Sequence, residues 1–309
     1  MRFFELTEIF YEQIKKEKVF NLWYDAKNKS HAILILGDAI KCLAAAEVAL
    51  AELMGAQFLG SDLRVKPHTD IDVIEEGTET ITVDIIRNLK LSASKKACLL
   101  PYRICVINSA DRMNVQAQNA LLKLLEEPPT DTKFILTARN KNAFLKTLLS
   151  RLIKINLTPI LPFECKQILI DKFEAEPKEA ERLSNIFDGL FSEMLECLTK
   201  EDNMKLLELA ERAEQDIERR NFYSLAARLD NILNQEDFVQ FLRYLKYILM
   251  YHFKFNKRAN NIKKIVDVIN ATLEYLEKNA NFGLAVSCFI VMFLQVKMRG
   301  DLGVGNFRS

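Results

Sequence analysis

Two short polar segments in the first half of the sequence carry residue types that could bind a nucleotide. The first is Gly37-Asp38-Ala39-Ile40-Lys41-Cys42, which follows the apolar run His31 to Leu36. A phosphate-binding loop uses glycines and a lysine in such a place, because bare backbone amides and the lysine contact the phosphates. The second is Asn108-Ser109, after the apolar run Arg103 to Ile107, where an ATPase needs acidic residues for magnesium and for the attacking water.

Both segments lack the residues that hydrolysis requires. A working loop has the form G-x-x-x-x-G-K-[ST], but the second glycine and the hydroxyl residue are absent, and Lys41 comes too early. Asp38 adds a negative charge where phosphate would lie, and Asn108 and Ser109 replace the acidic pair. We therefore expect no hydrolysis and no bound cofactor around Gly37. An ordinary α/β domain that never bound nucleotide fits these losses as well.

Strands and helices alternate around these segments. Apolar and β-branched runs predict strands over 31–36, 103–107, 133–137 and 153–157, and apolar spacing predicts helices over 39–54 and 114–127. Asn114 is placed to cap the second helix, and Pro128-Pro129 cannot continue it. The alternation predicts an α/β fold with a parallel sheet, whose ligand would bind at the carboxyl ends of the strands.

The second half of the sequence has a different pattern. Strand-like runs stop at the segment 158–162, and amphipathic helix patterns follow it. We expect three domains, over residues 1–160, 161–200 and 201–309, of which the last two are all-α. The run Phe282 to Val296 is nearly all apolar, but it is shorter than the ~20 residues that cross a bilayer, and it predicts a buried helix.

Composition restricts the partners. The 309 residues contain 43 Lys and Arg against 42 Asp and Glu, so any contact with nucleic acid must be local. One basic cluster could contact DNA phosphates, although such a cluster is more often a solvated face. Its members are Lys254, Lys257, Arg258, Lys263 and Lys264.

The cysteines and histidines do not form a metal-binding pattern. Six scattered cysteines without a C-x-x-C pair are expected to be reduced, buried thiols. His68 and His252 have no ligand partners at metal spacing, so no metal site is predicted. The first residues lack the basic-then-apolar order of a signal peptide, which predicts a cytoplasmic protein without a membrane partner.

The most specific signal is the run RICVINSADRMNVQAQNALLKLLEEPPTDTKFIL at 103–136, closed by TLLSRL at 147–152. This run resembles the bacterial clamp-loader branch of the AAA+ proteins, and most closely its delta-prime subunits. In that family the phrase Ala-Asp, followed by Asn-Ala-Leu-Leu-Lys and Glu-Glu-Pro-Pro, comes after the second catalytic strand. Ala110-Asp111 and Asn119 to Pro129 reproduce the phrase almost letter for letter. The resemblance is weakest beyond Phe163.

The resemblance implies an AAA+ nucleotide-fold domain with a degenerate phosphate loop over 1–160, a helical lid over 161–200 and a helical collar over 201–309. It implies a subunit that does not hydrolyse ATP but supports ATP-driven loading of the sliding clamp. The family ends this segment with Ser-Arg-Cys, whose arginine reaches the ATP of a neighbouring subunit. Ser150-Arg151 keep the first two letters, and Leu152 replaces the cysteine.

Two further departures accompany the resemblance. Leu53 to His68 contains no cysteine for the zinc module of many relatives, and Gly189 to Thr199 contains no arginine for a lid contact to nucleotide. The implied partners are motor subunits of the tau or gamma type and a delta subunit, with the clamp and primed DNA reached through the assembled complex. An active clamp-loader motor, another AAA+ ATPase and a purely structural scaffold remain as alternatives.

Overall fold

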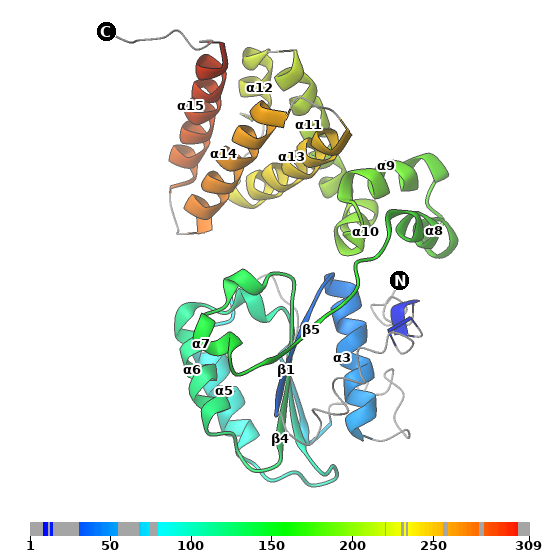
Figure 1. Ribbon diagram of the computed structural model, residues 1–309, viewed down its shortest axis with the longest axis vertical. Helices are drawn as coiled ribbons and strands as arrows, with labels where there is room; N and C mark the ends of the chain where they lie inside the picture. The colour runs from blue at the N-terminus through cyan, green and yellow to red at the C-terminus, as the bar shows by residue number, and fades with distance from the viewer. Residues whose placement is uncertain are drawn as a thin grey trace. The chain divides into compact units, whose positions relative to one another are not determined.

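A computed structural model describes residues 9–11, 13–14, 31–54, 68–74, 80–219, 221–229, 232, 234–255, 259–277 and 281–301. The chain divides into two compact units, unit 1 (Met1–Pro159) and unit 2 (Ile160–Ser309). Unit 1 contains a sheet and helices, whereas the described part of unit 2 is helical throughout (Figure 1). The change from strand patterns to helix patterns that the sequence shows at 158–162 thus coincides with the change in secondary structure.

The sheet of unit 1 has five parallel strands in the order β2-β3-β4-β1-β5. The strands are β1 (Ala32–Leu36), β2 (Ile71–Ile74), β3 (Arg103–Ile107), β4 (Thr132–Ala138) and β5 (Ile153–Asn156). The four predicted strands are confirmed. Sequence patterns do not predict β2, because this edge strand has only four residues, IDVI, and is half-exposed along most of its length. Such a short run carries no clear period.

Helices cover both faces of the sheet (Figure 1). Helix α3 (Ala39–Met54) lies on one face, and α5 (Val83–Ala93) and α6 (Val115–Glu126) lie on the other. Successive strand side chains point to opposite faces, so Leu34 packs into the core on the side of α5 and α6. The predicted cap of α6 is confirmed, because the Asn114 side chain accepts a hydrogen bond of 2.8 Å from the Ala117 amide.

A buried carboxylate organises the edge of the sheet at the amino end of β3. Asp70 is 0% exposed and accepts hydrogen bonds of 2.6–2.9 Å from three successive backbone amides, those of Cys98, Leu99 and Leu100. Burial by itself would raise the pKa of Asp70, but these three amides outweigh it and hold the pKa below its ordinary value. The loop before β3 is therefore held by one ionised side chain.

The thiols are less uniformly buried than the sequence suggested. Four are buried, but Cys98 is exposed and Cys288 is half-buried, so the expectation of buried thiols is wrong for Cys98. Cys98 lies in the surface loop held by Asp70, a placement that the apolar character of a cysteine does not reveal. Burial raises the pKa of both Cys105 and Cys197 to about 12, which keeps these thiols protonated at neutral pH.

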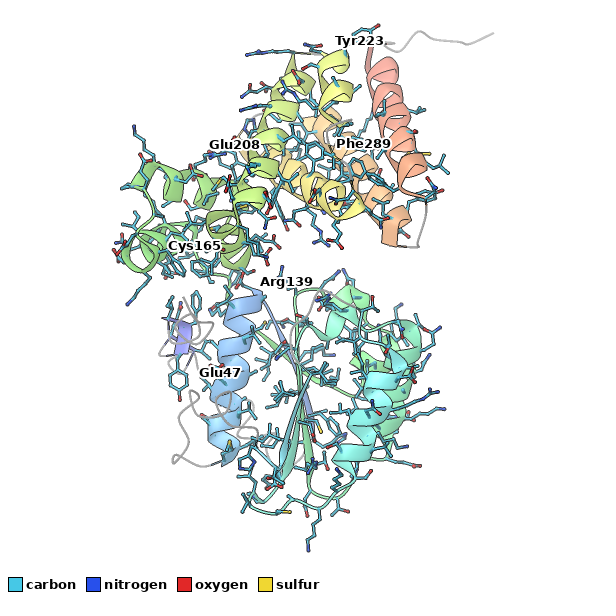
Figure 2. The ribbon with its side chains drawn as sticks, turned by 180° about the vertical axis from the view of Figure 1, so that it is seen from behind. Glu47, Arg139, Cys165, Glu208, Tyr223 and Phe289 are labelled. Atoms are coloured by element: carbon cyan, nitrogen blue, oxygen red, sulfur yellow. The ribbon has the colours of Figure 1, made fainter. Side chains whose placement is uncertain are left out.

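The described part of unit 2 consists of helices and their connections. They are α8 (Pro162–Phe173), α9 (Pro177–Phe187), α10 (Phe191–Thr199), α11 (Glu201–Glu218), α12 (Phe222–Leu229), α13 (Gln235–Phe255), α14 (Ala259–Glu277) and α15 (Phe282–Asp301). Aromatic side chains fill part of the core, where Phe238 lies within 6.4 Å of Phe241 and within 6.0 Å of Phe289, measured between ring centroids. Phe289 projects from α15 among the neighbouring helices (Figure 2).

The last helix is less buried than its composition suggested. Ala285 and Phe289 are buried, but Leu284 and Val291 are each 52% exposed, so the expectation of a buried helix holds for one face of α15 and is wrong for the other. An apolar sequence predicts a helix that prefers burial, but only the packing shows which faces have a neighbour. No helix within the described residues is both long and apolar enough to span a membrane.

Gly189 should tolerate no side chain. Its φ is +93°, and a Cβ at this position would lie 2.2 Å from the Ile160 carbonyl oxygen, so both the backbone and the space favour glycine. We expect Gly189→Ala to lower the free energy of unfolding by roughly 2–4 kcal/mol, measured by urea denaturation. Gly283→Ala is the matched control, because the nearest atom to its added Cβ is 3.5 Å away, and it should be neutral or slightly stabilising. Equal effects of the two variants would contradict this account.

The pH dependence of stability should include Asp70. Its pKa is lowered by folding, so its contribution is fully present above the ordinary carboxyl pKa of about 3.9 and is lost as the pH falls through the folded value. Asp70→Asn should lower stability at pH 7 by about 2 kcal/mol, because a charge-assisted acceptor is lost. Urea denaturation from pH 7 to pH 3 should show the difference from wild type shrinking below about pH 4. Asp84→Asn, at an exposed pair with Arg87, should change stability little.

Candidate functional site

The carboxyl ends of β1, β3 and β4 form the place where a parallel sheet of this kind binds a ligand. The described side chains there leave a cavity of about 10 Å³. It is lined by Ala39, Cys42, Leu43, Ser109, Thr137, Ala138 and Arg139. This volume accommodates about one water molecule, far less than a nucleoside triphosphate.

The amino end of α3 is capped by the chain's own carboxylate. Asp38 Oδ1 accepts hydrogen bonds from the backbone amides of Ile40 at 3.0 Å and Lys41 at 3.4 Å. The Gly37 amide donates to the Ala138 carbonyl oxygen at 3.2 Å. A helix amino terminus attracts anions through such amides and through the helix dipole. Asp38 therefore satisfies two amides of this helix end with a carboxylate from the chain itself.

Lys41 is directed into the protein. Its side chain is 1% exposed, and Nζ donates to the Thr158 carbonyl oxygen at 2.8 Å and to Thr158 Oγ1 at 2.9 Å. These bonds fasten α3 to the segment that follows β5. The neighbouring Cys42 thiol is also buried, and burial raises its pKa, so it remains a neutral thiol. The Lys41 ammonium group is therefore used in contacts within the chain.

The end of β3 carries neutral side chains in place of an acidic pair. Asn108 is buried, and its Oδ1 lies 3.4 Å from Thr137 Oγ1 on β4. Ser109 has a left-handed backbone, with φ of 50°, and its amide donates to Thr137 Oγ1 at 3.0 Å. The nearby Asp111 carboxylate accepts from the amides of Arg139 and Asn140 at 3.1 and 3.0 Å. This polar network joins β3 to the end of β4.

Arg151 lies on the surface of unit 1, outside the residues that line the cavity. It follows α7 (Lys146–Leu149), and its Nη2 is 3.3 Å from Glu126 Oε1 at the end of α6. The Arg151 side chain is 54% exposed. An exposed ion pair of this length is weak, so the guanidinium can exchange Glu126 for another anion at little cost. The adjacent Ser150 hydroxyl donates to the Thr147 carbonyl oxygen at 2.7 Å.

The segment that carries Arg151 is braced from inside. Gln118 on α6 is 2% exposed, and its amide nitrogen donates to the Met113 and Ala143 carbonyl oxygens at 3.1 and 2.9 Å. Its amide oxygen accepts from the Leu145 amide at 2.8 Å. Leu152, which directly follows Arg151, is 4% exposed and belongs to the core. The leucine therefore has a packing role. The sequence does not indicate this role of Gln118, because its hydrogen-bond partners lie up to 27 residues away.

His252 has partners that sequence spacing did not reveal. Its Nδ1 lies 3.0 Å from Glu214 Oε1, and the ligand atoms of Glu214, Glu218 and His252 all lie within 4.8 Å of one another. The expectation that His252 lacks partners is therefore wrong, because α11 and α13 bring these residues together across the chain. Burial raises the pKa of Glu214, and the charge interaction with His252 partly offsets this rise. His68 accepts a hydrogen bond from the Asp70 amide at 3.1 Å.

The basic cluster is described only in part. Lys254 Nζ lies 3.0 Å from both carboxylate oxygens of Asp188, so its charge already has a partner. Lys263 and Lys264 are exposed on α14, and Lys257 and Arg258 lie outside the described residues. The described members therefore add no geometry that favours a DNA contact over a solvated face.

Comparisons with known proteins find similarity along most of unit 1. Residues 12–161 match the family model described as DNA polymerase III, delta subunit. The chain is 25% identical to DNA polymerase III subunit delta' of Bacillus subtilis over 189 residues, which is 60% of this chain and 56% of the relative. It is 37% identical to the delta' subunit of Pseudomonas aeruginosa over 89 residues, which is 28% of this chain and 27% of the relative. The matches thus span about half or less of these relatives.

One solved structure is similar along most of the chain. It is a gamma subunit-related protein of DNA polymerase III from Thermotoga maritima, with 22% identity and a TM-score of 0.49, over 94% of this chain and 99% of that one. Over residues 12–161, about half of the chain, the sequence is therefore similar to delta-type subunits of DNA polymerase III. Three of the relatives that match the chain are delta' subunits.

The brace provided by Gln118 can be tested by a substitution of similar volume. Gln118→Leu would leave the Ala143 carbonyl and the Leu145 amide without this partner, so we expect a loss of roughly 2–4 kcal/mol in the free energy of unfolding. Hydrogen exchange should become faster at residues 143–146. Gln116→Leu, at an exposed position on the same helix, is the control and should change neither quantity. Unchanged exchange in Gln118→Leu would show that Gln118 does not hold this segment.

Proposed function

We propose that this chain is a non-hydrolysing, delta-prime-like subunit of the bacterial DNA polymerase III clamp loader, working in the cytoplasm during DNA replication. The observation that carries the proposal is the contrast between two cationic side chains of unit 1. Lys41 is buried and donates hydrogen bonds to Thr158, whereas Arg151 is exposed and forms an ion pair with Glu126. A buried lysine cannot serve a nucleotide bound in cis, whereas an exposed arginine can reach a neighbour's nucleotide.

The proposed division of labour follows from that contrast. Residues 1–160 serve as a nucleotide-fold domain without its own nucleotide, 161–200 as a lid and 201–309 as a collar for assembly. Asp38 supports the absence of a nucleotide at Gly37, because its carboxylate would repel phosphates and already holds two amides of α3. Asn108 and Ser109 support the absence of magnesium chemistry, because an amide and a hydroxyl replace carboxylates there. No metal or cofactor is assigned to the chain.

Arg151 is the proposed arginine finger, and Ser150 precedes it at the end of α7. In the assembled complex, the guanidinium would leave Glu126 and approach the ATP of an adjacent tau-type or gamma-type motor subunit. A fixed cation there offsets the negative charge that develops on the phosphate in the transition state. The other proposed partners are the delta subunit, the sliding clamp and primed DNA, the last two reached through the complex.

Two rival functions make different demands on the same residues. An active motor would need Lys41 at the phosphates, which requires breaking two half-buried hydrogen bonds to Thr158. A pure scaffold would keep Arg151 paired with Glu126 in the assembly as well. The scaffold is the harder rival to separate from the proposed function, because a surface ion pair by itself is an ordinary structural feature.

The test is reconstitution of the complex with Arg151→Ala. We expect complex formation to persist and hydrolysis at the adjacent site to fall by on the order of 10³, with clamp loading reduced accordingly. Arg151→Lys should recover little of the rate, because lysine lacks the planar pair of donors. Arg87→Ala removes another exposed, ion-paired arginine of unit 1 and should leave all rates unchanged. Intact hydrolysis and loading with Arg151→Ala would favour the scaffold.

A further inference from the structure

A single residue separates two groups of helices in unit 2. Lys200 lies between α10, which ends at Thr199, and α11, which begins at Glu201. Its φ of −116° and ψ of 109° interrupt the helix, as they would in a hinge. Hydrogen bonds nevertheless continue on both sides of it. The Lys200 amide donates to the Glu196 carbonyl oxygen at 3.1 Å, and the Met204 amide donates to the Lys200 carbonyl oxygen at 3.2 Å.

An arginine connects the two groups. Arg182 on α9 donates from Nε and Nη2 to the two carboxylate oxygens of Glu211 on α11, at 2.9 and 2.7 Å. Its Nη1 donates to Glu179 on its own helix at 2.8 Å. The side chains of Arg182, Glu179 and Glu211 are only 26–30% exposed. A two-point contact of this kind fixes the orientation of the helices as well as their distance.

Aromatic packing connects α9 to α13 as well. Phe187 is 1% exposed, and its ring centroid lies 5.7 Å from that of Tyr244 and 5.4 Å from that of Tyr247. Both ring pairs are edge-to-face, the arrangement that the ring quadrupoles favour. One residue further along, Asp188 contacts Lys254 near the end of α13 at 3.0 Å. That pair is exposed and adds less than the buried rings.

These contacts oppose rotation about Lys200 in different directions. Arg182 holds α9 to α11, whereas Phe187 holds the end of α9 to α13. Helices α11 and α13 also contact each other, so the contacts close a ring around the junction. Opening the junction would separate a two-point ion pair and expose a buried phenylalanine.

We propose that α8–α11 and α13 form one rigid body in which Lys200 is not a hinge, so that any displacement of α8–α10 is passed directly to α11 and α13. This coupling goes beyond the proposed function, since it rests only on contacts within unit 2. If the clamp-loader assignment holds, the helices assigned to the lid cannot move independently of the first helices assigned to the collar.

Hydrogen exchange on the full-length chain tests the proposal. In wild type, we expect the Lys200 and Met204 amides to open with the same free energy, and the same denaturant dependence, as the buried amides of α9 and α13. Exchange at these two amides through a separate opening of lower free energy, while α9 and α13 stay protected, would overturn it. This readout requires no substitution and therefore no assumption about the folding of a variant.

A matched pair of variants provides the second readout. Arg182→Ala should speed exchange at the Lys200 and Met204 amides at least tenfold and expose the Lys200–Glu201 bond to trypsin. Lys166→Ala is the control, because it removes a 2.8 Å ion pair with Glu181 that joins α8 to α9 without crossing the junction. The proposal predicts little change there. Equal exchange at the junction in the two variants would overturn the role of Arg182.

Discussion

The interior position of β1, between β4 and β5, constrains the residues at the carboxyl end of the sheet. β1 pairs with β4 on one side and with β5 on the other, and all five of its residues are buried. The chain must therefore turn at Gly37 directly against the ends of both neighbours. The Gly37 amide contacts Ala138 at the end of β4, and the Leu157 amide contacts Leu36 at the end of β1. Lys41 and Thr158 meet because the strands before them are paired.

That arrangement leaves an anion-attracting helix end which the protein satisfies internally. Asp38 takes the amides of α3, and Lys41 places its charge on oxygens of Thr158. Both are buried or half-buried interactions, so opening the site to a nucleotide would cost the hydrogen bonds as well as require space. Arg151 is held less firmly, because both it and its ion-pair partner Glu126 are exposed. The same unit thus contains one cation, Lys41, held in hydrogen bonds within the chain and one, Arg151, in an exposed ion pair.

In unit 2, side-chain contacts likewise join helices that lie far apart along the chain. Gly189 allows the turn after α9 to approach the Ile160 backbone, and the residues before that turn carry the contacts to α11 and α13. Pairs such as Arg182 with Glu211 combine charge with two-point geometry, and Phe187 adds buried area. A small number of side chains therefore decides whether two helical segments behave as one body.

Apolar spacing in the sequence was sufficient to predict β1, β3, β4, β5, α3 and α6. These elements are long enough to show a period, and α6 also has a recognisable cap in Asn114. The departure of residues 37–42 from the phosphate-loop pattern is visible in the sequence alone. The edge strand β2, the bond from Lys41 to Thr158 across 117 residues, the brace by Gln118 and the exposed face of α15 are not. Sequence spacing determines which face of an element is apolar. Only tertiary packing decides what that face or a polar side chain meets, because the partners lie far apart along the chain.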